Sequence, residues 1–117
     1  MSTILVVDDM PIFREPIAAT LRQEGYVTRC AQDGMEALRI VKEEPPDLIL
    51  LDIAMPVMDG LSCLRQLRAD PKTRGIPVIM LTAAAERQVV LNAVSAGIQG
   101  YLLKSRFSLD TMLAQVR

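Results

Sequence analysis

Three short runs of consecutive hydrophobic residues stand out along the chain, and each predicts a strand. They cover residues 4–7, 48–51 and 78–81, with the sequences Ile-Leu-Val-Val, Leu-Ile-Leu-Leu and Val-Ile-Met-Leu. A strand with helices on both of its faces needs hydrophobic residues on both sides, so this pattern predicts a buried parallel sheet. Residues 26–31 and 99–103 form weaker hydrophobic runs, which we interpret as strands at the edges of that sheet.

Hydrophobic residues spaced three or four apart predict five helices that alternate with these strands. The positions with this spacing are Phe13, Ile17 and Leu21; Met35, Leu38 and Val41; Leu61, Leu64 and Leu67; Val89, Val90, Ala93 and Val94; and Leu109, Met112, Leu113 and Val116. Pro16 falls just past the first turn of the first helix, where we expect a tolerated proline or a slight kink. Five strand-helix units in strict alternation predict an α/β fold, with a parallel sheet between two layers of helices.

Glycine and small polar residues mark the ends of the predicted helices. Gly25 and Gly97 follow the first and fourth helices, at the position where glycine commonly ends a helix. Asp33 and Asp59 precede the second and third helices as N-caps, and Ser108 precedes the last one.

The composition is that of a single α/β domain, which we place at residues 1–117. Half of the residues are hydrophobic and only 3% are aromatic, so we expect an aliphatic core. Lys and Arg number 13 against 14 Asp and Glu, which gives a net charge of -1 and no basic surface for nucleic acid. We interpret the basic residues Arg65, Arg68, Lys72 and Arg74 as a solvated helix end.

The two cysteines and the absence of histidine exclude several kinds of chemistry. Without histidine, a catalytic Cys-His pair is excluded, and Cys30 and Cys63 are too few for a zinc site. Both cysteines lie in hydrophobic patterns, which predicts buried or half-buried thiols of a reduced compartment. The chain has no signal-peptide pattern and no hydrophobic run long enough to span a bilayer, so we expect a cytoplasmic protein without a membrane partner.

Polar residues follow the predicted strands at the points where the strands end. Strand ends at the carboxyl edge of an open parallel sheet meet, and such folds bind ligands there. The residues at these positions are Asp8, Asp9, Asp52, Thr82 and Lys104.

Three carboxylates close together repel one another, so Asp8, Asp9 and Asp52 need positive charge nearby. Oxygen ligands alone favour Mg²⁺ over zinc or copper, and the Lys104 ammonium adds a further positive charge. Such a site suits an incoming phosphoryl group, to which Thr82 can donate a hydrogen bond. Asp52 is then placed to attack phosphorus as a carboxylate nucleophile.

Four sequence blocks resemble the receiver domains of two-component response regulators, and the resemblance extends over the whole chain. The blocks are Val6–Asp9, Asp52–Gly60, Leu81–Ala83 and Tyr101–Lys104. The resemblance implies a flavodoxin-like, doubly wound sheet of five parallel strands in the order 2-1-3-4-5 with five helices. It also implies a signalling switch that is phosphorylated on aspartate, rather than a conventional enzyme.

The resemblance assigns a role to each residue of the predicted site. Asp52 matches the phosphoacceptor, Asp9 the direct Mg²⁺ ligand and Asp8 its partner acting through water. The backbone carbonyl of Ala54 matches a further metal ligand. Lys104 matches the lysine that contacts the phosphoryl group.

Two further residues, Thr82 and Tyr101, match the switch residues of the family. The resemblance implies that a histidine kinase or histidine phosphotransfer protein phosphorylates the domain, which dephosphorylates itself slowly. Phosphorylation would then change the face formed by the fourth helix, the last strand and the last helix, and promote a homodimer. The output domain or target is not identified, and no direct contact of this domain with nucleic acid is expected.

Other residues of the motif are expected to be structural. We interpret Asp59 as an N-cap rather than a ligand, and Gly60 as a position that needs backbone freedom. Ser105 replaces the proline that usually follows the lysine in this family, so we predict a trans Lys104–Ser105 bond and a shifted loop. In this family, the residues at the positions of Ala54 and Ala84 flank the path of the water that hydrolyses the acyl phosphate. Alanine side chains there can neither block nor orient that water.

Two alternatives to the phosphorylated switch remain. A haloacid-dehalogenase-like phosphatase also uses an aspartyl phosphate, but it needs Asp-x-Asp after its first strand, and here Met10 follows Asp9. A receiver that binds partners without phosphorylation usually lacks the acceptor, an acidic partner or the lysine, whereas this sequence has all three.

Overall fold

Five parallel strands form the centre of the molecule. The computed structural model describes residues 2–82, 91–92, 94–95, 97–104 and 108–116. In chain order the elements are β1 Thr3–Val7, α1 Pro11–Gln23, β2 Val27–Ala31, α2 Gly34–Glu43, β3 Leu48–Asp52, α3 Gly60–Ala69, β4 Val78–Thr82, β5 Gly100–Leu103 and α5 Leu109–Val116. The strand order is β2-β1-β3-β4-β5, which confirms the predicted order and the two predicted edge strands.

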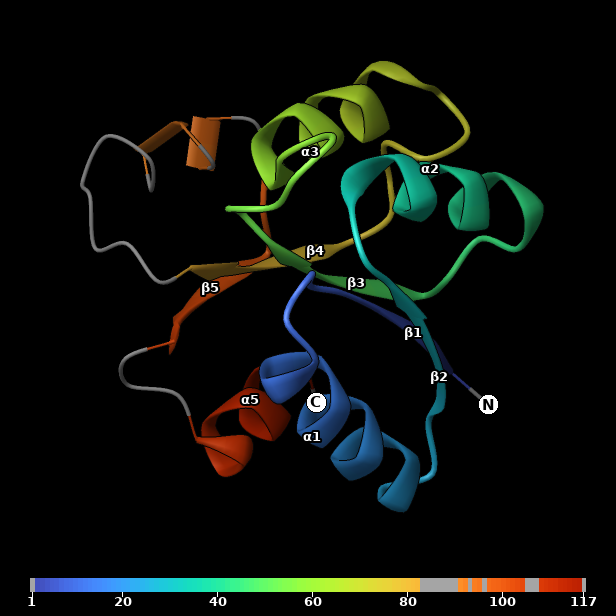
Figure 1. Ribbon diagram of the computed structural model, residues 1–117. Helices are drawn as coiled ribbons and strands as arrows, with labels where there is room; N and C mark the ends of the chain where they lie inside the picture. The colour runs from blue at the N-terminus through green and yellow to red at the C-terminus, as the bar shows by residue number, and fades with distance from the viewer. Residues whose placement is uncertain (1, 83–90, 93, 96, 105–107, 117) are drawn as a thin grey trace.

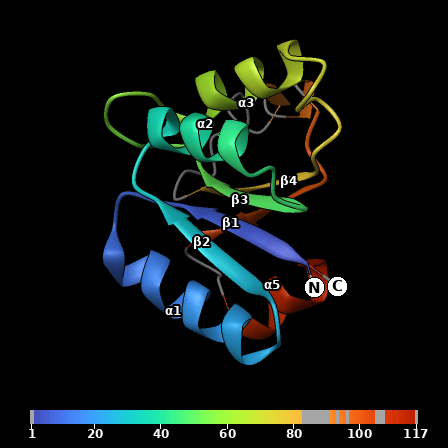
Figure 2. The same cartoon turned by 90° about the vertical axis from the view of Figure 1, so that its right-hand side faces the viewer.

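Two layers of helices cover the sheet, with α1 and α5 on one face and α2 and α3 on the other (Figures 1 and 2). Side chains alternate between the two faces of a strand, so each strand contributes to both layers. On β3, Leu48 and Leu50 belong to the cluster that includes α1 and α5, whereas Ile49 and Leu51 belong to the cluster of α2 and α3. This burial on two sides explains why the predicted strands are hydrophobic at every position.

The predicted helix ends are confirmed at several positions. Asp33 Oδ1 accepts from the Glu36 N–H at 2.8 Å, and Asp59 Oδ1 accepts from the Ser62 N–H at 2.7 Å. Ser108 Oγ accepts from the Thr111 N–H at 3.0 Å at the start of α5. Each of these side chains therefore satisfies a backbone donor that the first turn of a helix leaves free.

Glycines end two of the predicted helices as expected. Gly25 and Gly97 have φ angles of 93° and 92°, in the left-handed region that glycine adopts most easily. Helix α1 continues through Pro16, which is therefore the tolerated proline that we expected. Residues 91, 92, 94 and 95 are helical, within the predicted fourth helix, and the rest of that helix lies outside the described residues.

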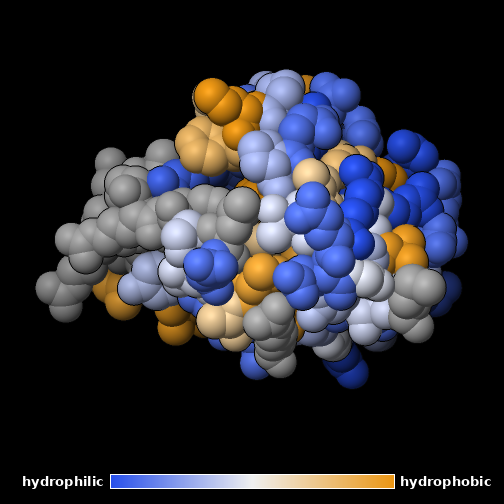
Figure 3. All heavy atoms as spheres, turned by 90° about the horizontal axis from the view of Figure 1, so that it is seen from below, coloured by the Kyte–Doolittle hydropathy of each residue, from blue (hydrophilic) through white to orange (hydrophobic). Residues whose placement is uncertain are grey.

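The surface and the cysteines agree with the sequence pattern. The face that carries α1 and α5 is largely hydrophilic, with hydrophobic atoms in small separate groups (Figure 3). Cys63 is buried and Cys30 half-buried, as predicted, and burial raises the pKa of the Cys63 thiol to about 12. Among the described helices, none has the length and hydrophobicity needed to cross a membrane.

Candidate functional site

Three aspartates meet at the carboxyl edge of the sheet, as the sequence predicted. Val7 of β1 pairs with Leu51 of β3, so the next residues, Asp8 and Asp52, lie side by side where the two strands end. Asp8 is fully buried, Asp52 is 2% exposed, and Asp9 is half-buried. One carboxylate oxygen from each of the three aspartates lies within 4.8 Å of the others. A cluster of acids this dense and this buried needs positive charge to be stable.

Lys104 provides positive charge within the cluster. Its ammonium nitrogen lies 2.9 Å from Asp8 Oδ2 and 3.3 Å from Asp52 Oδ1, and its side chain is 8% exposed. Three carboxylates against one ammonium still leave the site with two negative charges when every group is ionised. Lys104 therefore bridges two of the acids without neutralising the cluster.

The electrostatics of Asp52 follow from this arrangement. Burial and the neighbouring Asp8 carboxylate raise the pKa of Asp52, the Lys104 ammonium lowers it, and the net result is a pKa of about 6. The side chain is thus mostly ionised at neutral pH, as a carboxylate nucleophile must be. Its pKa nevertheless shows that the negative charge is unfavourable here without a further cation.

One oxygen of Asp8 is available to such a cation. Asp8 Oδ1 accepts a hydrogen bond from the Met10 N–H at 3.0 Å. Asp8 Oδ2 is buried and, in the part of the chain that the structure describes, has only the ion pair with Lys104 and no partner with hydrogen-bond geometry. A buried carboxylate oxygen without a hydrogen bond, beside two other carboxylates, fits a hard divalent cation such as Mg²⁺. This acidic cluster is typical of the magnesium site of receiver domains.

Backbone contacts fix the position of Asp8. Its N–H donates to the carbonyl of Ala31 at 3.1 Å, which extends the pairing of β1 with β2 by one residue. Arg14 Nη1 donates to the carbonyl of Asp8 at 2.8 Å, from the first turns of α1. We did not identify Arg14 from the sequence, because a side chain that contacts a backbone carbonyl leaves no motif.

The loop after Asp52 is fixed at both ends. The N–H of Gly60 donates to the carbonyl of Ile53 at 2.8 Å, and the N–H of Gly34 donates to the carbonyl of Met58 at 3.2 Å. A Cβ on Gly60 would collide with the backbone oxygen of Asp52. Gly60 has no positive φ, so the backbone freedom that we expected there is not its role. It is instead required for the close approach of α3 to the end of β3.

The same loop contains Val57, which is the non-glycine residue with a positive φ among the described residues. Val57 has a φ of 67°, and its side chain is 80% exposed. A β-branched residue rarely adopts this conformation because Cβ crowds the adjacent backbone. The backbone strain at Val57 therefore lies within the loop that follows Asp52.

The structure describes some of the other predicted site residues only in part. Thr82 is the last residue of β4, but its side chain lies outside the described part of the chain. Ala54 and Tyr101 are exposed, with Tyr101 on β5 at 45%. Ser105, and with it the predicted trans Lys104–Ser105 bond, lies outside the described residues, as does Ala84.

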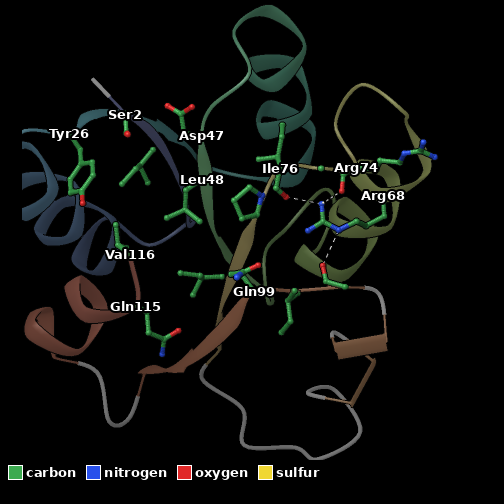
Figure 4. A pocket seen from close by; sticks show the side chains of 16 residues that line it. Ser2, Tyr26, Asp47, Leu48, Arg68, Arg74, Ile76, Gln99, Gln115 and Val116 are labelled. Carbon is green, nitrogen blue, oxygen red and sulfur yellow. Dashed lines mark hydrogen bonds between the residues drawn. The ribbon is translucent and has the colours of Figure 1, made fainter.

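A cavity of about 800 Å³ lies at the opposite, amino edge of the sheet. Its lining includes Asp47, Arg68 and Gln115, and none of the three aspartates of the acidic cluster (Figure 4). Asp47 Oδ2 accepts from the Thr3 N–H at 2.7 Å. The charge of Asp47 is thus already used to complete a backbone hydrogen bond.

Arg68 serves the same purpose at this edge. Its guanidinium donates to the backbone carbonyls of Gly97, Arg74 and Ile76 at 2.9, 3.1 and 2.8 Å (Figure 4). The interpretation of Arg68 as part of a solvated helix end was wrong, because it is half-buried and joins two loops. Burial lowers the pKa of its guanidinium.

Comparison with known proteins agrees with the fold. The response regulator receiver domain family matches residues 4–117. The chain is 37% identical over 117 residues to the DNA-binding dual master transcriptional regulator RpaA of Synechocystis sp., a match that covers 100% of this chain and 48% of RpaA. It is 38% identical over 102 residues to the chemotaxis protein CheY-3 of Vibrio cholerae, a match that covers 86% of this chain and 78% of CheY-3.

Solved structures show the same likeness. The fold matches the chemotaxis response regulator CheY4 of Vibrio cholerae with a TM-score of 0.91 and 31% identity, over 99% of this chain and 96% of that one. This chain belongs to the response regulator receiver domain family of two-component signalling. It spans about half the length of several curated relatives, including RpaA, which are full-length regulators.

Proposed function

We propose that residues 1–117 form one receiver domain in which Asp52 accepts a phosphoryl group from a histidine kinase or histidine phosphotransfer protein. The observation that supports this most strongly is the meeting of Asp8, Asp9 and Asp52 with Lys104 at the carboxyl edge of the sheet. A surplus of buried negative charge beside an ammonium group is stabilised most by a ligand that brings a divalent cation with it.

In the proposed reaction, an Asp52 carboxylate oxygen attacks the phosphorus of a phosphohistidine whose other ring nitrogen is protonated. A P–O bond forms and the P–N bond breaks, and the electron pair of the P–N bond returns to the ring. The imidazole leaves neutral because its other nitrogen keeps that proton. In the same proposed step the Lys104 ammonium, which lies 3.3 Å from Asp52 Oδ1, contacts an oxygen of the transferred group.

The metal site of the proposal consists of oxygen ligands. Asp8, Asp9, Asp52 and the carbonyl of Ala54 would hold Mg²⁺, which supplies positive charge at the phosphoryl oxygens when it is bound. The Met10 N–H and the Arg14 guanidinium hold Asp8 in position for this role.

We assign the response to phosphorylation to Thr82 and Tyr101. In the proposal the Thr82 hydroxyl contacts the new phosphoryl group, and the exposed Tyr101 ring changes its orientation. The affected face comprises the predicted fourth helix, β5 and α5, and the phosphorylated form dimerises through it. Water then hydrolyses the acyl phosphate slowly.

RpaA is described as a DNA-binding regulator and CheY-3 as a chemotaxis protein, and their identities to this chain are 37% and 38%. The receiver sequence does not favour one of these outputs over the other, so we propose the switch and not its target.

Phosphorylation of Asp52 can be tested by intact mass. The protein is incubated with Mg²⁺ and acetyl phosphate, and we expect one added phosphoryl group in the wild type and none in Asp52→Asn. Asp59→Asn is the matched control, because Asp59 lies in the same loop and caps α3 without joining the acidic cluster. A beryllofluoride complex is the second measurement, since acyl phosphates are short-lived.

Other outcomes would favour the alternatives. A wild type that takes no phosphoryl group and no beryllofluoride would indicate a receiver that binds partners without phosphorylation. Turnover of unrelated phosphate esters would indicate a phosphatase. An equal adduct in Asp52→Asn would show that another residue is the acceptor.

A further inference from the structure

Phe13 lies outside the hydrophobic core, although its spacing predicted a core residue. It shares one face of α1 with Ile17 and Leu21, which are 1% and 0% exposed and belong to the core. Phe13 is half-buried and, among the described residues, belongs to neither of the two core clusters. The first turn of α1 therefore places an aromatic ring beyond the core, toward the acidic cluster.

The Phe13 ring contacts the ammonium group of Lys104. The ammonium nitrogen lies 4.4 Å from the centre of the Phe13 ring, well within the range of a cation–π interaction. The same ammonium lies 2.9 Å from Asp8 Oδ2 and 3.3 Å from Asp52 Oδ1. Because the Lys104 side chain is 8% exposed, the interaction takes place largely out of water, where cation–π attraction is strongest.

We propose that Phe13 is a positioning residue for Lys104, an inference that rests on the proposed phosphorylation of Asp52. The two carboxylates that hold the ammonium are also the predicted metal ligands, so a bound cation reduces the negative charge they present to it. The face of the Phe13 ring carries no competing charge and binds no hard cation. The ring therefore holds Lys104 beside Asp52 while the charges around it change.

The sharpest test changes the electron density of the ring and leaves its shape nearly unchanged. Phe13 is replaced site-specifically by phenylalanine with one, two or three fluorine atoms, which progressively weaken the negative face of the ring. We expect the rate of phosphorylation by acetyl phosphate at saturating Mg²⁺ to fall stepwise. The largest loss, about threefold to tenfold, is expected for Phe13→Leu, and Phe13→Tyr should retain most of the wild-type rate.

Two controls separate positioning from a general loss of structure. Ile12→Leu changes an exposed residue of the same helical turn and should leave the rate unchanged. The affinity of Phe13→Leu for Mg²⁺, measured by metal-binding titration, should stay within about twofold of the wild-type affinity, since all three carboxylates remain. A distorted site would instead weaken Mg²⁺ binding together with the rate.

A measurement on the free protein tests the contact without any reaction. The protons on Cε of Lys104 should show an upfield ring-current shift by NMR in the wild type, and Phe13→Leu should abolish it. If the wild type is phosphorylated and neither fluorination nor Phe13→Leu changes the rate, the positioning role of Phe13 is overturned and the proposed function is not. A wild type that takes no phosphoryl group would overturn the proposed function, and this role with it.

Discussion

The two edges of the sheet use charged residues in opposite ways. At the amino edge, Asp47 and Arg68 complete backbone hydrogen bonds, one to an N–H and the other to three carbonyls. At the carboxyl edge, Asp8, Asp52 and Lys104 are buried together, and Asp8 Oδ2 has no hydrogen-bond partner among the described residues. The cavity of about 800 Å³ lies at the amino edge, yet the unsatisfied charge lies at the carboxyl edge. Surplus buried charge, rather than cavity size, therefore indicates the chemical site here.

The largest expected effect concerns backbone packing at the carboxyl edge. Gly60→Ala would force the end of β3 and the start of α3 apart, because the new Cβ collides with the backbone of Asp52. We expect a loss of about 3 kcal/mol in the free energy of unfolding, measured by urea denaturation. Gly75→Ala is the matched control at the amino edge, where a Cβ meets nothing within 4 Å, and should change stability by less than about 0.5 kcal/mol. Equal stability of the two variants would contradict the close approach.

A smaller loss is expected when Arg68 is removed from the amino edge. Arg68→Ala leaves three carbonyls without their donor, and we expect a loss of about 2 kcal/mol by urea denaturation. Phosphorylation of Asp52 at saturating Mg²⁺ should stay at the wild-type rate. Arg74→Ala, which removes an exposed basic side chain nearby, should cost less than about 0.5 kcal/mol. A strong loss of phosphorylation in Arg68→Ala would mean that the two edges are coupled.

Removal of the Asp52 charge from the carboxyl edge should raise the stability of the protein, whereas the two preceding substitutions lower it. The pKa of Asp52 is raised from 3.8 to about 6 in the folded state, so the folded protein binds this proton more tightly than the unfolded chain does. The bound proton therefore stabilises the folded protein below pH 4, and this stabilisation is lost as the pH rises through about 6. Without Mg²⁺, Asp52→Asn should therefore be at least about 1 kcal/mol more stable than wild type at pH 7, because the buried site favours the neutral side chain.

The advantage of Asp52→Asn should disappear near pH 4, where the wild-type carboxyl group is largely protonated. Thermal unfolding in EDTA at the two pH values measures both states. Asp47→Asn is the contrasting variant, because it weakens the acceptor for the Thr3 N–H and should lower stability slightly at pH 7. Destabilisation by Asp52→Asn at pH 7 would show that the charge of Asp52 is already compensated.

Most of the fold could be predicted because its signals are local. The N-caps Asp33 and Asp59 act on backbone groups three residues away, and the glycine at position 97 is defined by its own φ. The acidic cluster was also predictable, since parallel strands bring their carboxyl ends together. These features depend on neighbours in sequence or on one rule of topology.

The parts that the sequence did not reveal depend on contacts between distant residues. The periodicity of α1 placed Phe13 on the correct face but could not show that this face extends beyond the core to Lys104. Arg68 joins carbonyls from two loops, and Gly60 is required by the end of β3 rather than by its own backbone angles. Nothing in the pattern of hydrophobic and polar residues encodes such distances.

The smallest predicted effect compares the same substitution at the two edges. Val57 at the carboxyl edge has a φ of 67°, whereas Val27 begins β2 at the amino edge with extended backbone. Asparagine tolerates the left-handed region better than a β-branched residue does, so Val57→Asn should stabilise the protein by about 0.5–1 kcal/mol. Val27→Asn should destabilise it by a similar amount, because valine favours extended backbone. Thermal unfolding of both variants measures the difference, and a loss of stability in Val57→Asn would show that Val57 is not strained. Opposite signs would place the backbone strain in the loop that follows Asp52, at the edge that also carries the surplus charge.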